Sequence, residues 1–333
     1  MGIELRRALD IVLRTSPYVI YRAFMYGAMC LCVIAYLAML FAIGLVFGAG
    51  AFWVLFVISA GLAAMLGIGG FINEYVFHQL RAGHIAVITE IVTQGKFPPG
   101  ISQTKWARGR VTHYFKGAGT LAHVRRLTRD VIRAVNRVND LASIMPLPGI
   151  ETGMLLGRRI IDLSQAYIEE GVFAYTYRAK NENVYESAKS ATLTYSQCWR
   201  AVLGNAVTLT LISYGFALVC TVVFLIPLGT VALLWFNAGI TNEATLFSDT
   251  IARFVLFAIG IFLGFAAKWA IFDPIASASI IITFLEEADI TEVTPELEEQ
   301  LDKQLHQFHV LREKASEYSA IPGFQPSFIE KQA

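Results

Sequence analysis

Residues 24–47 read FMYGAMCLCVIAYLAMLFAIGLVF and contain no charged side chain. As an α-helix, this run is about 36 Å long, which is enough to cross the roughly 30 Å hydrocarbon core of a bilayer with some tilt. A second uncharged run, residues 52–72, follows after a short turn. We therefore expect residues 24–72 to form a transmembrane helical hairpin, preceded by an interfacial helix within residues 1–23. The mean hydropathy of +0.53 and the 55% of hydrophobic residues also indicate a membrane protein.

A second pair of apolar runs lies in the C-terminal half of the chain, at residues 206–235 and 251–285. Both are longer than one span requires. We expect a kink at Pro227 in the first run, and the end of the second span at Asp273, which precedes a proline and is expected to cap the next helix. The two runs predict a second transmembrane hairpin over residues 204–273.

The distribution of positive charge predicts the topology. All but two of the 27 Lys and Arg residues lie in residues 1–23, 73–203 and 274–333. Because cytoplasmic segments carry the excess of Lys and Arg, these three segments, including both termini, are expected on the cytoplasmic side of the inner membrane. The predicted fold is all-α: a polytopic membrane protein with two transmembrane hairpins, four spans in total, and a cytoplasmic helical layer.

Apolar periodicity of 3.6 residues divides the cytoplasmic layer into helices. The expected helices cover residues 74–94, 121–138, 151–180, 184–203 and 295–318. A polar connection is expected at 95–119 and a proline hinge at 145–149, while the helix at 184–203 leads directly into the third span. Residues 274–285 are expected either to lie along the inner interface or to pack on the cytoplasmic layer.

The basic segment 96–137 is the most distinctive part of this layer, because Asp130 is its only acid. Its helix is predicted to present a surface that binds anionic lipid headgroups or a partner, formed by Arg125, Arg126, Arg129, Arg133 and Arg137. The acidic segment 286–302, which contains no base, is an alternative partner within the same chain. A protein partner or a second copy of the chain is expected at the cytoplasmic layer, and binding of nucleic acid is not.

Lys268 and Asp273 are the only charges in the apolar part of the fourth block after Arg253, and they form a possible intramembrane site. The alternative is structural, with the lysine reaching the interface and the aspartate capping a helix. Pairs such as Glu74 with His78 provide at most half of a metal site, so no metal and no cofactor is expected. The sequence contains no nucleophile, phosphate-loop or dinucleotide motif, which favours a protein that is not an enzyme.

Two segments, GHIAVITE at residues 83–90 and ENVYESAK at residues 182–189, resemble a family of uncharacterised prokaryotic four-span membrane proteins, and Phe272-Asp273-Pro274 is similar to that family as well. The second segment, continued to Asn205, also resembles the final portion of the choline-transporter-like family. That resemblance implies transport of a small amine or a lipid-like substrate, although this chain lacks the ten-span organisation of that family.

These observations lead to two functional hypotheses. The first is a non-enzymatic inner-membrane protein whose cytoplasmic helices bind lipid headgroups, a partner or another copy of the chain. The second is a transporter or lipid-moving protein that uses Lys268 and Asp273.

Overall fold

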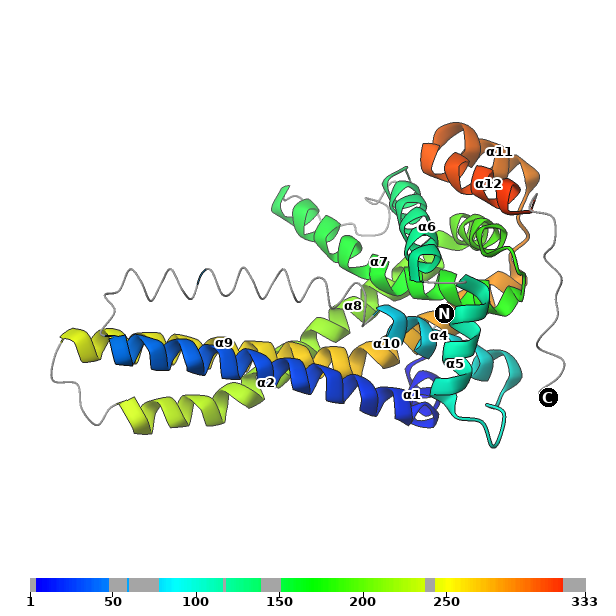
Figure 1. Cartoon of the computed structure of the whole chain (residues 1–333). Helices are drawn as coiled ribbons and strands as arrows, with labels where there is room; N and C mark the ends of the chain where they lie inside the picture. Colours follow the sequence, from blue (N-terminus) through cyan, green and yellow to red (C-terminus); the bar gives the residue numbers. More distant parts are fainter. Residues whose placement is uncertain are drawn as a thin grey trace. The chain divides into compact units, whose positions relative to one another are not determined.

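The computed structural model describes residues 4–47, 59, 78–115, 118–138, 151–236 and 243–319 (Figure 1). Within these ranges all regular secondary structure is helical, which confirms the predicted all-α class. Three described stretches are long and apolar enough to cross a membrane: Ser16–Tyr36, Val184–Leu234 and Val255–Ile290. The second apolar run, residues 52–72, lies outside the described residues except for position 59, and so does the hinge at 145–149. The four-span arrangement therefore stays a prediction.

The chain divides into two compact units. Unit 1 comprises Met1–Thr15, Arg81–Leu211 and Ile275–Ala333, and unit 2 comprises Ser16–Leu80 and Ile212–Pro274. Most charged residues belong to unit 1, and the long apolar runs belong largely to unit 2. The division thus follows the polar and apolar blocks of the sequence.

Unit 2 is built from long apolar helices. α2 (Ser16–Phe47) packs along α9 (Glu243–Ala267), where Tyr26 and Cys30 are buried in one cluster with Ala266. Several large apolar side chains of unit 2 are more than half exposed: Phe24, Leu31, Leu218, Val219, Ile226 and Leu234. A surface of this kind is suited to contact with lipid rather than with water.

α8 (Val184–Phe236) approaches α9 closely at two glycines that are one helical turn apart. A Cβ atom added at Gly264 would lie 2.8 Å from the backbone N and Cα atoms of Thr221. A Cβ atom added at Gly260 would collide instead with the end of the Leu225 side chain. The two glycines therefore allow the two backbones to pack directly, as small residues at four-residue spacing do between membrane helices.

Unit 1 is a layer of shorter helices together with the first part of α8. These helices are α1 (Leu5–Arg14), α4 (His78–Gln94), α5 (Gln103–Phe115), α6 (Ala118–Val138), α7 (Glu151–Ala179), α10 (Asp273–Ile290), α11 (Pro295–Gln304) and α12 (His306–Ser319). Every residue of 82–89 on α4 and of 276–285 on α10 is buried. These two helices therefore form the core of unit 1, and α10 packs in that core, which was one of its two expected positions.

Several predicted helix boundaries are confirmed. The N-terminal segment differs, because the interfacial helix expected within residues 1–23 ends at Arg14 and α2 already begins at Ser16. α7 ends at Ala179, and α8 begins at Val184 and leads into the third apolar run, with a kink at Cys198. Thr294 has an extended conformation ahead of Pro295, the first residue of α11.

Two predictions were wrong: the non-helical connection at 95–119 and the single unbroken helix at 295–318. Residues 103–115 form helix α5 within the expected polar connection, because Ala107, Tyr114 and Phe115 are buried against other helices of unit 1. The expected single helix 295–318 is instead divided at Leu305, which has an extended backbone (φ −121°, ψ 102°) and a buried side chain. Burial of Leu305 requires a turn that no glycine or proline marks in the sequence.

The helix around Asp273 also differs from the prediction. α9 continues through a π-helical turn, η3 (Lys268–Phe272), directly into α10, and Asp273 has helical backbone angles (φ −59°, ψ −38°) rather than those of a cap. The π-helical turn directly precedes Asp273-Pro274, and Pro274 cannot donate a hydrogen bond to the carbonyl four residues before it. In α8 a residue with non-helical angles is Cys198 (φ −102°, ψ 17°), whereas Pro227 lies inside the helix and the bend expected there stays a prediction.

Candidate functional site

The predicted arginine surface of α6 is partly engaged by α7. The Arg125 Nε donates to Glu169 Oε2 at 3.0 Å, and the Arg129 Nε donates to Glu169 Oε1 at 2.6 Å. The Arg133 Nε donates to Gln165 Oε1 at 3.0 Å. Arg126 is exposed, whereas the side chain of Arg137 lies outside the described residues. Of the four members whose side chains are described, Arg126 and Arg133 are exposed.

The contact between α6 and α7 is a buried charge network. Glu169 is only 4% exposed, and Glu170 beside it forms an ion pair with Arg81 of α4 at 3.6 Å. Burial lowers the pKa of Arg125, while the charge of Glu169 opposes that shift. An arginine stays protonated at physiological pH, so the network keeps its charges. It holds three helices of unit 1 together.

The acidic segment 286–302 has other partners than the ones proposed from the sequence. Its ion pairs join Glu286 to Arg7 of α1, Asp289 to Arg178 of α7, Glu298 to Lys189 of α8 and Asp302 to Arg312 of α12. The segment therefore connects helices within unit 1.

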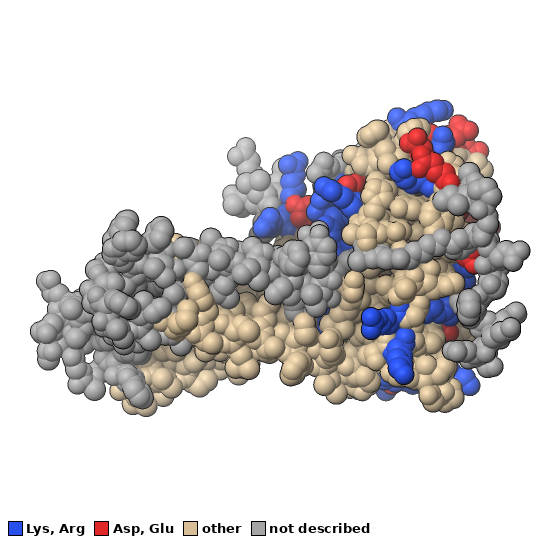
Figure 2. All heavy atoms as spheres, in the orientation of Figure 1, with Lys and Arg blue, Asp and Glu red and all other residues tan. Residues whose placement is uncertain are grey.

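A mixed basic and apolar surface is formed by α1 and the chain that leads into α5. Leu9, Leu13 and Ile101 are 45%, 66% and 43% exposed. The same segments carry exposed bases, of which Arg14 forms an ion pair with Asp10 at 2.8 Å: Arg6, Arg14, Lys96, Lys105 and Arg108. We call these eight residues the α1–α5 surface. On the face in Figure 2, Lys and Arg gather over helices of unit 1, while the described surface of the long apolar helices shows none.

Two hydrogen bonds fix the α1–α5 surface. The Gln103 side chain donates to the backbone oxygen of Arg14 at 2.9 Å, which holds the start of α5 against the end of α1. The Thr15 hydroxyl and the His84 Nε2 atom are 2.9 Å apart, which joins the end of α1 to α4. Because α2 begins at the residue after Thr15, the surface is attached directly to the first apolar helix.

Lys268 and Asp273 meet in unit 2. Their Nζ and Oδ1 atoms are 2.9 Å apart, and the side chains are 7% and 14% exposed. The Ser213 hydroxyl donates to Asp273 at 3.2 Å, and the Lys268 ammonium lies 5.0 Å from the centre of the Tyr214 ring. Residues five apart lie on different sides of an α-helix, so the π-helical turn is what brings this pair together.

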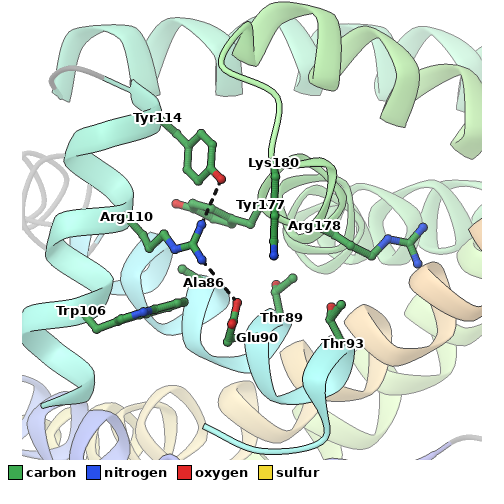
Figure 3. Close-up of a pocket in the computed structure, with 10 residues that line it drawn as sticks. All are labelled: Ala86, Thr89, Glu90, Thr93, Trp106, Arg110, Tyr114, Tyr177, Arg178 and Lys180. Atoms are coloured by element: carbon green, nitrogen blue, oxygen red, sulfur yellow. Dashed lines mark hydrogen bonds and ion pairs between the residues drawn. The ribbon is translucent and has the colours of Figure 1, made fainter. Parts of the chain in front are cut away.

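A polar pocket opens in unit 1 between α4, α5 and the end of α7 (Figure 3). Its lining consists of Ala86, Thr89, Glu90, Thr93, Trp106, Arg110, Tyr114, Tyr177, Arg178 and Lys180. The enclosed part holds about one water molecule. The pocket therefore does not enclose a whole metabolite.

Arg110 is fixed at one wall of this pocket. Its guanidinium carbon lies 4.9 Å from the centre of the Trp106 ring, and its Nη1 donates to the Tyr114 oxygen at 3.0 Å. Its Nη2 is 3.8 Å from the Glu90 carboxylate, which is an ion pair but longer than a hydrogen bond. Burial raises the pKa of Tyr114, so its hydroxyl stays protonated at physiological pH.

Lys180 approaches the pocket from the opposite wall (Figure 3). Its backbone is in the left-handed region, with φ 49°, directly after the last residue of α7. The neighbouring Arg178 is turned away, since its Nη1 donates to Asp289 Oδ1 at 2.6 Å. Sequence reasoning missed this site because Glu90 and Lys180 are far apart in the chain and neither belongs to a motif.

Comparison with known proteins adds no relative: no family model, no curated protein and no solved structure matches this chain. The resemblance of residues 83–90 and 182–189 to other membrane proteins therefore stays a prediction.

Proposed function

We propose that this protein is a non-enzymatic inner-membrane protein whose unit 1 binds anionic lipid headgroups through the α1–α5 surface. One observation supports the proposal most: exposed leucines and arginines share α1, and α1 is joined through a single residue to an apolar helix long enough to span a membrane. Apolar side chains that enter the headgroup layer, with bases beside them, are the features of an interfacial helix. Each base near an anionic surface contributes about 1 kcal/mol of attraction.

The surface differs from the one predicted from the sequence. Arg125 and Arg129 of the predicted row contact Glu169 of α7, so we assign the headgroup contact mainly to α1 and residues 96–108. Arg126 and Arg133 remain exposed and are available to a protein partner or to a second copy of the chain.

Hydrogen–deuterium exchange of the whole protein in lipid nanodiscs tests the headgroup contact. We expect slower exchange at residues 95–102, which form no helix, when phosphatidylglycerol is added to phosphatidylcholine. The double variant Lys105→Glu/Arg108→Glu should remove this difference, because charge reversal turns the attraction into repulsion. The effect should also weaken at high salt.

Lys303→Glu is the matched control, because Lys303 is an exposed lysine of α11 outside the α1–α5 surface. It should leave the lipid dependence at residues 95–102 unchanged. Exchange that does not depend on the anionic lipid, or that the double variant does not alter, would rule out the proposed contact.

A second candidate function is transport of a small amine or a lipid-like substrate through unit 2. The observation that favours it is the buried Lys268–Asp273 pair at a π-helical turn within an apolar stretch, because such turns and such pairs are frequent at functional sites.

Reconstitution into liposomes tests this candidate with choline-like amines and labelled lipids. Flux that is lost in Lys268→Ala, and retained in the control Lys303→Ala, is the expected result for a transporter. Absence of flux for every tested substrate would count against it.

A further inference from the structure

The polar pocket of unit 1 has its own charge balance, separate from the α1–α5 surface. Three bases line it, and two of them already have partners: Arg178 binds Asp289, and Arg110 faces Glu90. Among the described residues, no ion pair involves Lys180. Lys180 is exposed at the rim, and Glu182, two residues further along the chain, is an additional acid near the pocket, since its charge adds to burial in raising the pKa of Tyr114 in the lining.

The backbone conformation at Lys180 is unusual. Lys180 occupies the left-handed position after a helix, where glycine or asparagine is usual and a longer side chain is strained. In Figure 3 the Lys180 side chain points into the opening toward Thr89, and the Arg110 guanidinium enters from the other side. Arg110 has five N–H donors, and Nη1 supplies the described hydrogen bond, to Tyr114.

The size of the pocket limits what can enter it. Because the enclosed space holds about one water molecule, it admits an oxygen atom of a ligand but not the whole ligand. A phosphate group suits this geometry, since its oxygens can contact an ammonium, a guanidinium and a threonine hydroxyl at the same time while the rest of the molecule stays outside. Thr93 provides an exposed hydroxyl at the rim.

We propose that this pocket binds a phosphate group, held by Lys180 and Arg110, either as free phosphate or as part of a lipid headgroup. The inference goes beyond the α1–α5 surface, and only its lipid form rests on the proposed function. Glu90 and the carbonyl ends of α4 and α7 oppose an anion here. We therefore expect weak binding that strengthens when the Glu90 charge is removed.

Amine-reactive labelling of the whole protein, read by mass spectrometry at each lysine, tests the proposal. In phosphatidylcholine nanodiscs, inorganic phosphate should slow the labelling of Lys180 several-fold relative to chloride at equal ionic strength. Lys303, whose side chain is 77% exposed, should not respond. In a parallel arm, nanodiscs with phosphatidic acid or phosphatidylglycerol replace the free phosphate.

Two variants make the result specific. Glu90→Gln should lower the half-protecting phosphate concentration about tenfold, because one unit charge is removed within a few ångströms of the anion. Thr93→Val should raise it by a smaller factor. If free phosphate slows the labelling of Lys180, the ligand is soluble. If only the anionic lipid slows that labelling, the ligand is a lipid headgroup.

Unchanged labelling of Lys180 in both arms overturns the proposal, as does a Glu90→Gln variant that binds phosphate less well. The free-phosphate arm uses a neutral bilayer and does not depend on the α1–α5 surface. Its outcome is therefore separate from the exchange experiment, and either idea can fail while the other stands.

Discussion

Glu169→Ala is expected to lower the free energy of unfolding by about 3 kcal/mol or more. The Glu169 carboxylate accepts hydrogen bonds from both Arg125 and Arg129, and it is almost fully buried. Removing it takes away the counter-charge of two guanidinium groups inside unit 1, which is far more costly than losing an exposed ion pair. Thermal unfolding of the detergent-solubilised protein, followed by circular dichroism at 222 nm, measures the loss.

Two further variants define the origin of this loss. Glu169→Gln keeps an oxygen acceptor, so its unfolding midpoint should lie between those of the wild type and Glu169→Ala. Glu299→Ala removes a carboxylate whose pair with Lys303 is largely exposed, and it should change the midpoint very little. If Glu169→Ala and Glu299→Ala unfold at the same temperature, the buried network does not hold α6 to α7.

Gly264→Leu should prevent α8 and α9 from packing closely. The free energy of unfolding should fall by about 3 kcal/mol or more. The new Cβ atom would lie 2.8 Å from the backbone of Thr221, and a backbone cannot move aside as a side chain can. Unfolding of the protein in nanodiscs, compared with the wild type, measures this effect.

The same substitution at Gly229 is the matched control. Gly229 lies on α8 in the same unit, and a Cβ atom there meets nothing within 4 Å. Gly229→Leu should therefore leave packing unchanged. A milder change, Gly260→Ala, should be rescued by Leu225→Ala because its obstacle is the end of a side chain, whereas no side-chain change at Thr221 should rescue Gly264→Leu. Equal stability of the Leu variants at positions 264 and 229 would refute the close approach.

The candidate sites differ in how far the sequence could predict them. Lys268 and Asp273 stand out as charges in an apolar stretch, so the sequence identifies both residues. It does not predict the π-helical turn that joins them, since the local Asp-Pro signal favours a helix start at that point. For the arginine row the sequence indicates a charged helix face, but Glu169, which engages two of its members, lies on another helix.

The pocket at Arg110 and Lys180 is a product of tertiary structure alone. Trp106, Arg110 and Tyr114 lie in a segment that carries no regular apolar periodicity, and they are ordered as helix α5 by packing on distant residues such as Tyr177. Opposite Arg110, the position of Lys180 depends on the end of α7 and on a left-handed backbone conformation. The sequence does not indicate that conformation, because the residue is not a glycine.

By itself the sequence determined the helical class, the apolar helices suited to a membrane and the start of a helix at Pro295. These features depend on local composition, on 3.6-residue periodicity and on capping, which act within a few turns of chain. Only the tertiary structure decided which charges are paired, which are exposed and where helices bend. Those outcomes depend on which helices become neighbours, and the free energy of burying a group is set by its neighbours rather than by its place in the sequence.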